Sequence, residues 1–110
     1  MDNDLQAKIN ILKQGYLKKL EGMILEFKAI LEKISLSNIE ELYSKVHTIS
    51  GTSGMYGLSE LSSFSTDFEV YLKKINNDKK IYNEDVLKDL LIKYIDDIAI
   101  AIVIKGEING

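Results

Sequence analysis

The chain has 110 residues, of which 45% are apolar and 28% are charged, and it carries a net charge of −3. This is the size and composition of a globular protein, and we expect a single domain over residues 1–110. All 14 basic residues are lysines, which argues against a nucleic-acid surface. Cysteine is absent, which excludes a disulfide scaffold, a thiol nucleophile and a thiolate zinc site.

The sequence also argues against a targeting or membrane segment. The first five residues, MDNDL, lack the basic and apolar regions of a signal peptide. The longest apolar run, IAIAIVI, is well short of the ~18 residues of a membrane-spanning helix. We therefore expect a cytoplasmic protein with no membrane partner.

The first predicted segment repeats apolar residues at steps of three and four, which is the helical pattern. Gly15 is a candidate break between a short leading helix and the main helix. The apolar positions of the segment are Ile9, Leu12, Tyr16, Leu20, Met23, Phe27, Ile30 and Ile34.

The second and third helices follow after short polar stretches. Ser37 is expected to cap the second helix together with Glu40, in a capping box, and Ser59 is expected to cap the third. The apolar stripe of the second helix is Ile39, Leu42, Val46, Ile49, Ser53 and Tyr56, and that of the third is Leu61, Phe64, Phe68, Leu72 and Ile75.

The fourth helix is predicted to begin at Asn83, with acids at Glu84 and Asp85 that suit a helix N-terminus. Its apolar positions are Leu87, Leu91, Tyr94, Ile98 and Ile102. The β-branched run IAIAIVI at its end would also suit a strand, but no partner strand is visible, so we predict helix. The fold class is therefore all-α: an antiparallel up-and-down four-helix bundle with a short extra N-terminal helix.

The second helix holds the only histidine of the sequence, His47. A rotation of about 100° per residue puts His47 roughly 130° from the centre of the apolar stripe, so its side chain is expected to face outward. The neighbours one turn away are Tyr43, Ser44, Ser50 and Gly51, and Gly54 lies two turns away on the same side. Most of them are small, and two helical glycines weaken a helix, so they favour a surface left clear for a partner protein.

Glu69 is the second candidate residue. If the helices turn near Gly57, His47 and Glu69 lie at nearly the same height on adjacent antiparallel helices. A carboxylate there could hold one ring nitrogen and leave the other free as a nucleophile. Both residues also have a simpler interpretation, because a lone surface histidine usually has no function and Glu69 can equally be a solvated acid.

Other chemistries fit the sequence less well. One histidine without cysteine cannot build the usual zinc sites, and NNDKK lacks the ligand spacing of a calcium loop. The glycine-rich GTSGMYG has no lysine for a phosphate-binding loop. Ser50 or Ser53 near His47 suggests a serine nucleophile, but no third member or oxyanion site is evident.

The segment HTISGTSGMYGLSELSSFSTDFE, from His47 to Glu69, resembles the signature of histidine-containing phosphotransfer (HPt) domains. After the histidine this signature has an apolar residue at +2, glycine at +4, small residues at +5 and +6, glycine at +10, leucine at +14 and glutamate at +22. The matching residues here are Ile49, Gly51, Thr52, Ser53, Gly57, Leu61 and Glu69.

The resemblance implies a four-helix bundle that carries a phosphoryl group on His47, accepted from the aspartate of one receiver domain and passed to another. Gly51 and Gly54 would make room for the receiver, Glu69 would orient the ring, and Gly57 would be structural. The implied partners are response-regulator receivers and a sensor histidine kinase. The Mg²⁺ used in transfer would belong to the receiver, so we expect no cofactor or metal in this chain. The resemblance also implies a monomer that serves as a phosphotransfer intermediate and is not an enzyme.

One departure from the family pattern affects function. The family usually has lysine at +3, where this chain has Ser50. The position at +19, which is often cysteine or histidine in the family, is Thr66 here. A hydroxyl supplies no charge to a phosphoryl group, and Lys45 could substitute only by bending around from another face. Two alternatives therefore stay open: a docking module that is not phosphorylated, and a phosphoacceptor domain attached to a kinase.

Overall fold

The computed structural model describes the backbone of residues 2–109 and the side chains of residues 3–105. Within these residues the chain is all-helical, as predicted. Two 3₁₀ turns, η1 (Leu36–Asn38) and η2 (Lys79–Ile81), lie in the connections. The long helices are α1 (Asp2–Glu32), α2 (Ile39–Met55), α3 (Ser59–Asn77) and α4 (Glu84–Asn109).

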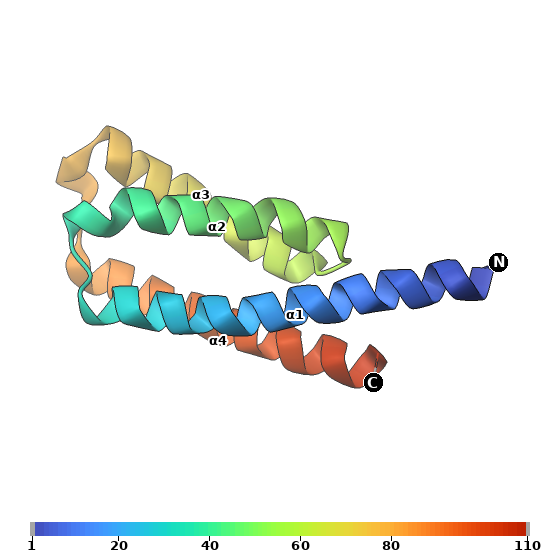
Figure 1. Ribbon diagram of the computed structural model, residues 1–110. Coiled ribbons are helices and arrows are strands. Elements are labelled where there is room, and N and C mark those ends of the chain that lie inside the picture. Colours follow the sequence, from blue (N-terminus) through green and yellow to red (C-terminus); the bar gives the residue numbers. More distant parts are fainter. Residues whose placement is uncertain (1, 110) are drawn as a thin grey trace.

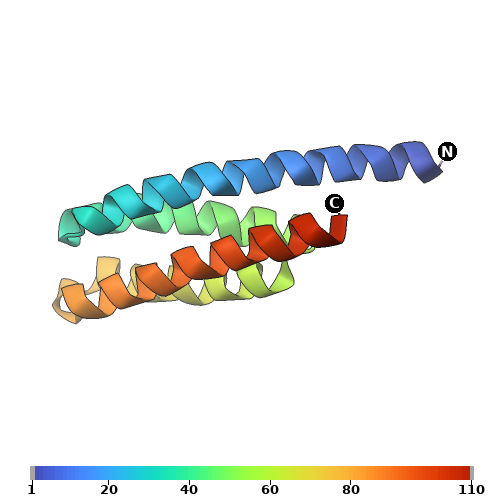
Figure 2. The same ribbon diagram turned by 90° about the horizontal axis from the view of Figure 1, so that it is seen from below.

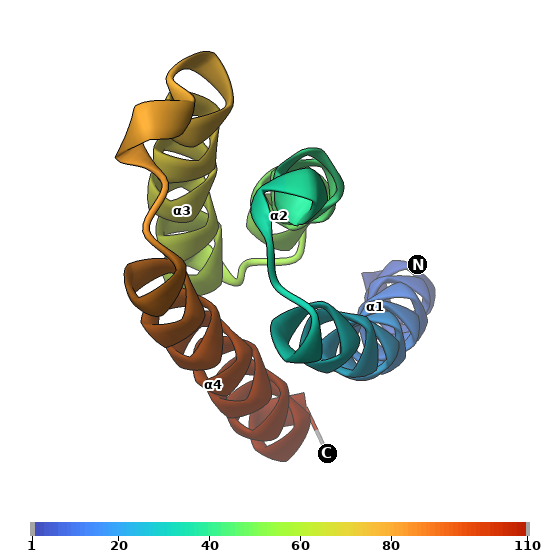
Figure 3. The ribbon, with the colours of Figure 1, turned by 90° about the vertical axis from the view of Figure 1, so that its left-hand side faces the viewer.

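Consecutive helices run in opposite directions along one long axis (Figure 1). The molecule measures 55 × 23 × 18 Å, and α1 extends well beyond the other helices at its N-terminal end (Figures 1 and 2). Seen along the axes, the helices surround a common interior (Figure 3). The pairs α2–α3 and α1–α4 make the most extensive contacts, and α3 packs more loosely on α4.

The core consists of the apolar stripes of all four helices. The stripe of α2 is buried as predicted from Ile39 to Ser53, and α4 buries Leu87, Leu91, Tyr94 and Ile98. Three residues predicted to face the core are instead exposed: Ile9 at 45%, Leu12 at 59% and Phe64 at 40%. The first buried residue of α1 is Tyr16, so Ile9 and Leu12, which precede it, lie outside the core.

The predicted break at Gly15 is wrong. Residues 2–32 form one continuous helix, α1, of 31 residues, so the predicted short leading helix is part of α1. Gly15 is exposed, and a Cβ added there would meet nothing within 4 Å. A single helical glycine costs about 1 kcal/mol, which is less than burial of the adjacent Tyr16 and Leu17 contributes.

Both predicted N-caps are also wrong. The Ser37 hydroxyl bonds Ser35 Oγ at 2.7 Å, and the cap of α2 is Asn38, without a side-chain hydrogen bond. Ser59 is the first residue of α3, whose cap residue Leu58 has no capping side chain. The predicted start of the fourth helix is correct to within one residue: α4 begins at Glu84, and Asn83 caps it, because the Asn83 Oδ1 accepts a hydrogen bond from the Val86 N–H at 3.1 Å.

Gly57 fixes the turn between α2 and α3. Its φ is +76°, in the left-handed region that favours glycine. The Leu58 N–H donates to the Ser53 carbonyl at 2.9 Å and the Gly57 N–H donates to the Gly54 carbonyl at 3.3 Å, which is the Schellman arrangement of a helix C-terminus. The motif satisfies the last carbonyls of α2 and reverses the chain, so that α3 runs back alongside His47.

The β-branched run near the C-terminus belongs to α4, and the strand alternative is wrong. Packing of Ile98 in the core stabilises the helix there despite the modest helix propensity of isoleucine and valine. Among the residues described, no helix combines the length and apolar character needed to cross a membrane.

Candidate functional site

His47 lies in the middle of α2 and faces away from the core. Its neighbours Val46 and Ile49 are fully buried, whereas the His47 side chain is 66% exposed. The helical period therefore places a solvent-accessible imidazole directly beside a rigid, packed stripe. A ring held on such a helix is positioned by the backbone and remains open to another protein.

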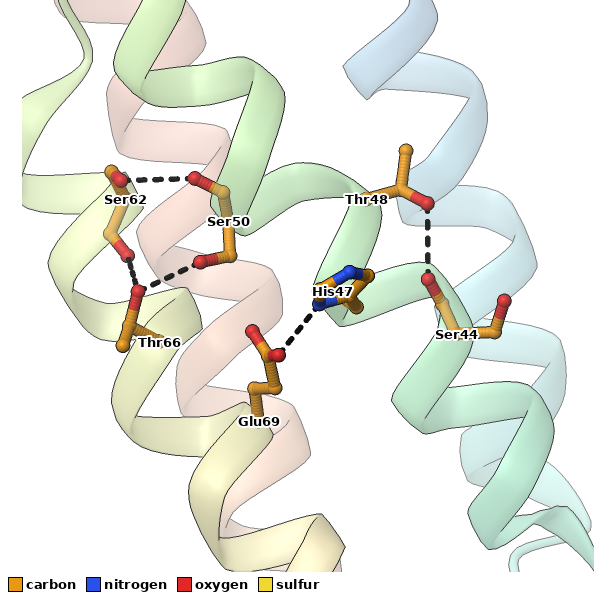
Figure 4. Close-up of polar contacts among 7 residues, drawn as sticks. All are labelled: Ser44, His47, Thr48, Ser50, Ser62, Thr66 and Glu69. Carbon is orange, nitrogen blue, oxygen red and sulfur yellow. Dashed lines mark hydrogen bonds and ion pairs between the residues drawn. The ribbon is translucent and has the colours of Figure 1, made fainter.

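Glu69 of α3 contacts the inner nitrogen of this ring (Figure 4). The distance from His47 Nδ1 to Glu69 Oε1 is 2.6 Å, and the Glu69 side chain is only 18% exposed. The two residues therefore lie at the same height, as helical geometry predicts. An ionised carboxylate can only accept, so Nδ1 donates, and in the neutral ring Nε2 then carries the lone pair.

Tyr43, one turn before His47, contacts the ring from another side. The two ring centroids are 5.9 Å apart and the planes differ by 10°, a stacked arrangement. Tyr43 is itself half-buried against the core. Stacking and the Glu69 hydrogen bond together limit rotation of the imidazole and leave its outer edge, with Nε2, to solvent.

A chain of hydroxyl groups joins α2 to α3 one turn beyond His47 (Figure 4). Ser50 Oγ and Thr66 Oγ1 are 2.7 Å apart, Thr66 donates to the Ser62 carbonyl at 2.9 Å, and Ser62 donates to the Ser50 carbonyl at 3.0 Å. Sequence reasoning missed Ser62. The signal that could have found it is the spacing of hydroxyls at 62 and 66, one turn apart on a single face of α3.

Lys45 does not replace the missing lysine. Its Nζ lies 3.0 Å from Glu26 Oε1 on α1, so its charge is directed to the opposite side of α2 from Glu69. The position three residues after His47 is therefore occupied by the neutral Ser50–Thr66 pair alone.

The two glycines near His47 have different surroundings. At Gly51, which is exposed, an added Cβ would meet nothing within 4 Å, whereas at Gly54 it would lie 3.4 Å from Ser62 Oγ. Gly54 thus faces Ser62 of α3, where an added Cβ would make an ordinary van der Waals contact. Ser44 is also exposed, and its carbonyl accepts from Thr48 at 3.0 Å.

A buried polar pair fixes the rotation of α3. Ser65 is fully buried and its hydroxyl lies 2.6 Å from that of Tyr94 on α4. The Tyr94 ring packs edge-on against Phe68 at 5.2 Å, and burial raises the pKa of Tyr94 above its usual value. With Ser65 and Phe68 held toward α4, Thr66 and Glu69 are turned toward α2.

Comparison with known proteins finds similarity to a chemotaxis protein. Over 88 residues the chain is 28% identical to the chemotaxis protein CheA of Rhizobium meliloti (strain 1021), in an alignment that covers 76% of this chain. The chain spans only 12% of the length of that relative. No known protein-family model matches the sequence, and no solved structure matches it. Most of this chain is thus similar to a short part of a chemotaxis protein.

Proposed function

We propose that the chain is a histidine-containing phosphotransfer domain of a two-component phosphorelay, with His47 as the phosphoryl acceptor. One observation carries the proposal: an exposed imidazole whose Nδ1 donates to Glu69 Oε1 at 2.6 Å while Nε2 faces solvent. This arrangement presents one nitrogen lone pair at a fixed position, which is what nucleophilic attack on a partner's phosphoryl group requires.

The reaction begins with Nε2, which carries no proton in this tautomer. Its lone pair forms a bond to the phosphorus of a receiver's aspartyl phosphate, and the bond from phosphorus to the aspartate oxygen breaks with its electron pair. The ring keeps the Nδ1 proton and gains positive charge, which faces the Glu69 carboxylate. Glu69 therefore stabilises charge that develops during transfer and is a positioning residue as well. The reverse reaction passes the phosphoryl group to a second receiver.

The surroundings of His47 suit a protein partner. Gly51 is exposed with open space around it, so a receiver domain can approach α2 closely at this point. On this proposal residues 1–110 form one domain, the four helices are its up-and-down bundle, and docking uses Tyr43, Ser44, Gly51 and Gly54. The Mg²⁺ and most of the catalysis belong to the receiver, so the chain is a carrier and not an enzyme.

A second source of the phosphoryl group is favoured by the similarity to CheA. In the chemotaxis kinases that the sequence signature resembles, the domain is attached to a kinase and a glutamate orients the histidine. The contact between Glu69 and His47 has that form. On this variant a histidine kinase supplies the phosphoryl group from ATP, with ADP as the leaving group, and the acceptor atom is still Nε2 of His47.

Phosphotransfer from labelled partners tests the proposal. The chain is incubated with a ³²P-labelled receiver and, separately, with a histidine kinase and labelled ATP; acid-labile label on the chain is expected in at least one reaction. The label should disappear in His47→Gln and persist in Thr48→Ala, a matched control whose hydroxyl bonds only the Ser44 carbonyl. Docking without transfer from either source would leave a binding module and refute the carrier. Label that survives in His47→Gln would refute the assignment of the acceptor.

A further inference from the structure

The imidazole of His47 has contacts on two sides that can stabilise positive charge on the ring. Glu69 Oε1 lies 2.6 Å from Nδ1, at the edge of the ring. Tyr43 stacks on the face of the ring, with the two centroids 5.9 Å apart and the planes at 10°. This centroid distance is within the roughly 6 Å over which an aromatic face attracts a cation, because the face of the ring is negative.

Tyr43 is held against His47 by the fold. Its side chain is half-buried and packs on the core, and it precedes His47 by four residues, so the two side chains are neighbours on the surface of α2. Within the part of the chain that the structure describes, the Tyr43 hydroxyl forms no hydrogen bond. The aromatic face, and not the hydroxyl, is therefore what Tyr43 offers to His47.

Neither position considered for a phosphoryl-binding lysine supplies one. Ser50, three residues after His47, lies 2.7 Å from Thr66 through their hydroxyl groups. The Lys45 ammonium is 3.0 Å from Glu26 on the other side of α2. Stabilisation of the phosphorylated form therefore depends more on contacts with the ring itself.

We propose, on the basis of the proposed function, that Tyr43 stabilises phosphorylated His47 through a cation–π contact with the imidazolium ring. In transfer, Nε2 bonds to phosphorus, the donor oxygen leaves with its electron pair, and the ring keeps the proton on Nδ1. The phosphorylated ring is therefore positive, whereas the free ring in this tautomer is neutral. Because an aromatic face attracts the positive ring more strongly, Tyr43 shifts the equilibrium toward phosphohistidine. Tyr43 acts through the ring and is a positioning residue.

The test measures the equilibrium distribution of ³²P between the chain and the partner that labels it, either a receiver domain or a kinase with ATP. The equilibrium constant for the free species compares phosphorylated with unphosphorylated chain and does not depend on how tightly the partner docks. Tyr43→Leu should lower this constant about two- to fivefold, which is the size of an exposed cation–π contact. Tyr43→Phe keeps the aromatic face and should restore the constant to near the wild-type value.

Tyr71→Leu is the matched control. Tyr71 is also a half-buried tyrosine packed on the core, but it lies about 160° around α3 from Glu69 by helical rotation, so the equilibrium constant should equal that of the wild-type chain. Proton NMR of the unphosphorylated chain reports the stacking directly, because His47 is the only histidine of the sequence. The upfield shift that a stacked aromatic ring gives the C–H signals of His47 should be lost in Tyr43→Leu and kept in Tyr43→Phe and Tyr71→Leu.

The outcomes separate this inference from the proposed function. An unchanged equilibrium constant or unchanged His47 signals in Tyr43→Leu would overturn the inference and leave the carrier function intact. A fall in Tyr43→Phe or Tyr71→Leu as large as that in Tyr43→Leu would also overturn it, because the aromatic face would then not be the cause. A wild-type chain that takes no label would refute the proposed function and this inference with it. Helical circular dichroism checks the fold of each variant, and Tyr43→Met replaces Tyr43→Leu if the leucine variant does not fold.

Discussion

Substitution of Glu69 by alanine removes the hydrogen-bond acceptor of the His47 ring while leaving the nucleophile in place. Glu69 contacts Nδ1 at 2.6 Å and is 18% exposed, whereas the imidazole is 66% exposed. The carboxylate therefore acts on the ring from a partly desolvated position, and water can reach the ring from the other side. Loss of the contact frees the ring to rotate and to adopt the other tautomer, in which Nε2 is protonated and cannot attack.

The expected size of the effect follows from this geometry. A hydrogen bond to a charged group contributes about 1.5–3 kcal/mol when it is well shielded. Because solvent reaches the imidazole, we take about 1–2 kcal/mol, which corresponds to a roughly 5- to 30-fold slower transfer. Glu69→Gln keeps an accepting oxygen without the charge, so its rate should lie between those of Glu69→Ala and the wild-type chain. The assay is the single-turnover rate of ³²P transfer at saturating partner.

A matched control separates this effect from a general loss of surface charge. Glu26→Ala removes a carboxylate that pairs with Lys45 at 3.0 Å on the far side of α2, and its transfer rate should equal that of the wild-type chain. The reasoning would be refuted if Glu69→Ala transferred at the wild-type rate. A loss in Glu26→Ala as large as that in Glu69→Ala would equally refute it, because the contact with His47 would then not be the cause.

Three further predictions concern the surroundings of the site and the core. Gly51→Leu should raise the melting temperature slightly, because leucine favours helix over glycine by about 1 kcal/mol and meets no neighbour there. The same substitution should slow transfer by more than about tenfold, because the larger side chain excludes the partner. Normal transfer would show that docking occurs elsewhere. Ser50→Lys, at the cost of the exposed hydrogen bond to Thr66, should increase the lifetime of the phosphorylated chain, measured by loss of label, because an ammonium group can pair with the phosphoryl group. Tyr94→Phe leaves the buried Ser65 hydroxyl without its side-chain partner and should lower the free energy of unfolding by about 1–3 kcal/mol in urea melts. Burial raises the pKa of Tyr94, so the folded state retains this proton after the unfolded state loses it; stability should fall as pH rises above about 10, and less steeply in Tyr94→Phe.

The arrangement of the helices follows largely from local sequence. The steps of three and four in the apolar residues predict all four helices. The start of α4 is predicted to within one residue, and the Asn83 side chain that caps it needs only the N–H three residues later. Gly57 is similarly local, since its positive φ and the Schellman bonds involve only residues 53–58. Such features depend on contacts within one or two turns, which the order of residues specifies directly.

The break at Gly15 is wrong because distant packing decides it, whereas the caps at Ser37 and Ser59 are wrong because local turns move the cap positions by one residue, to Asn38 and Leu58. Burial of Tyr16 and Leu17 continues α1 through the glycine, and a 3₁₀ turn moves the start of α2 from Ser37 to Ile39. Exposure of Ile9 and Leu12 also depends on distant packing. Their spacing is that of core residues, but the turn from α2 to α3 begins beside Tyr16, and a helix cannot encode where its neighbours end.

For the candidate site, the sequence by itself determines that His47 faces outward, because helical rotation relative to Val46 and Ile49 fixes its direction. It also limits Glu69 to the same height, since both are similar distances from the turn at Gly57. Only the tertiary structure decides that the two side chains touch at 2.6 Å, that Lys45 pairs with Glu26 instead of approaching His47, and that Ser50 bonds Thr66. These contacts depend on how α3 is rotated about its own axis, and that rotation is set by Ser65 and Phe68 packing against Tyr94 of α4.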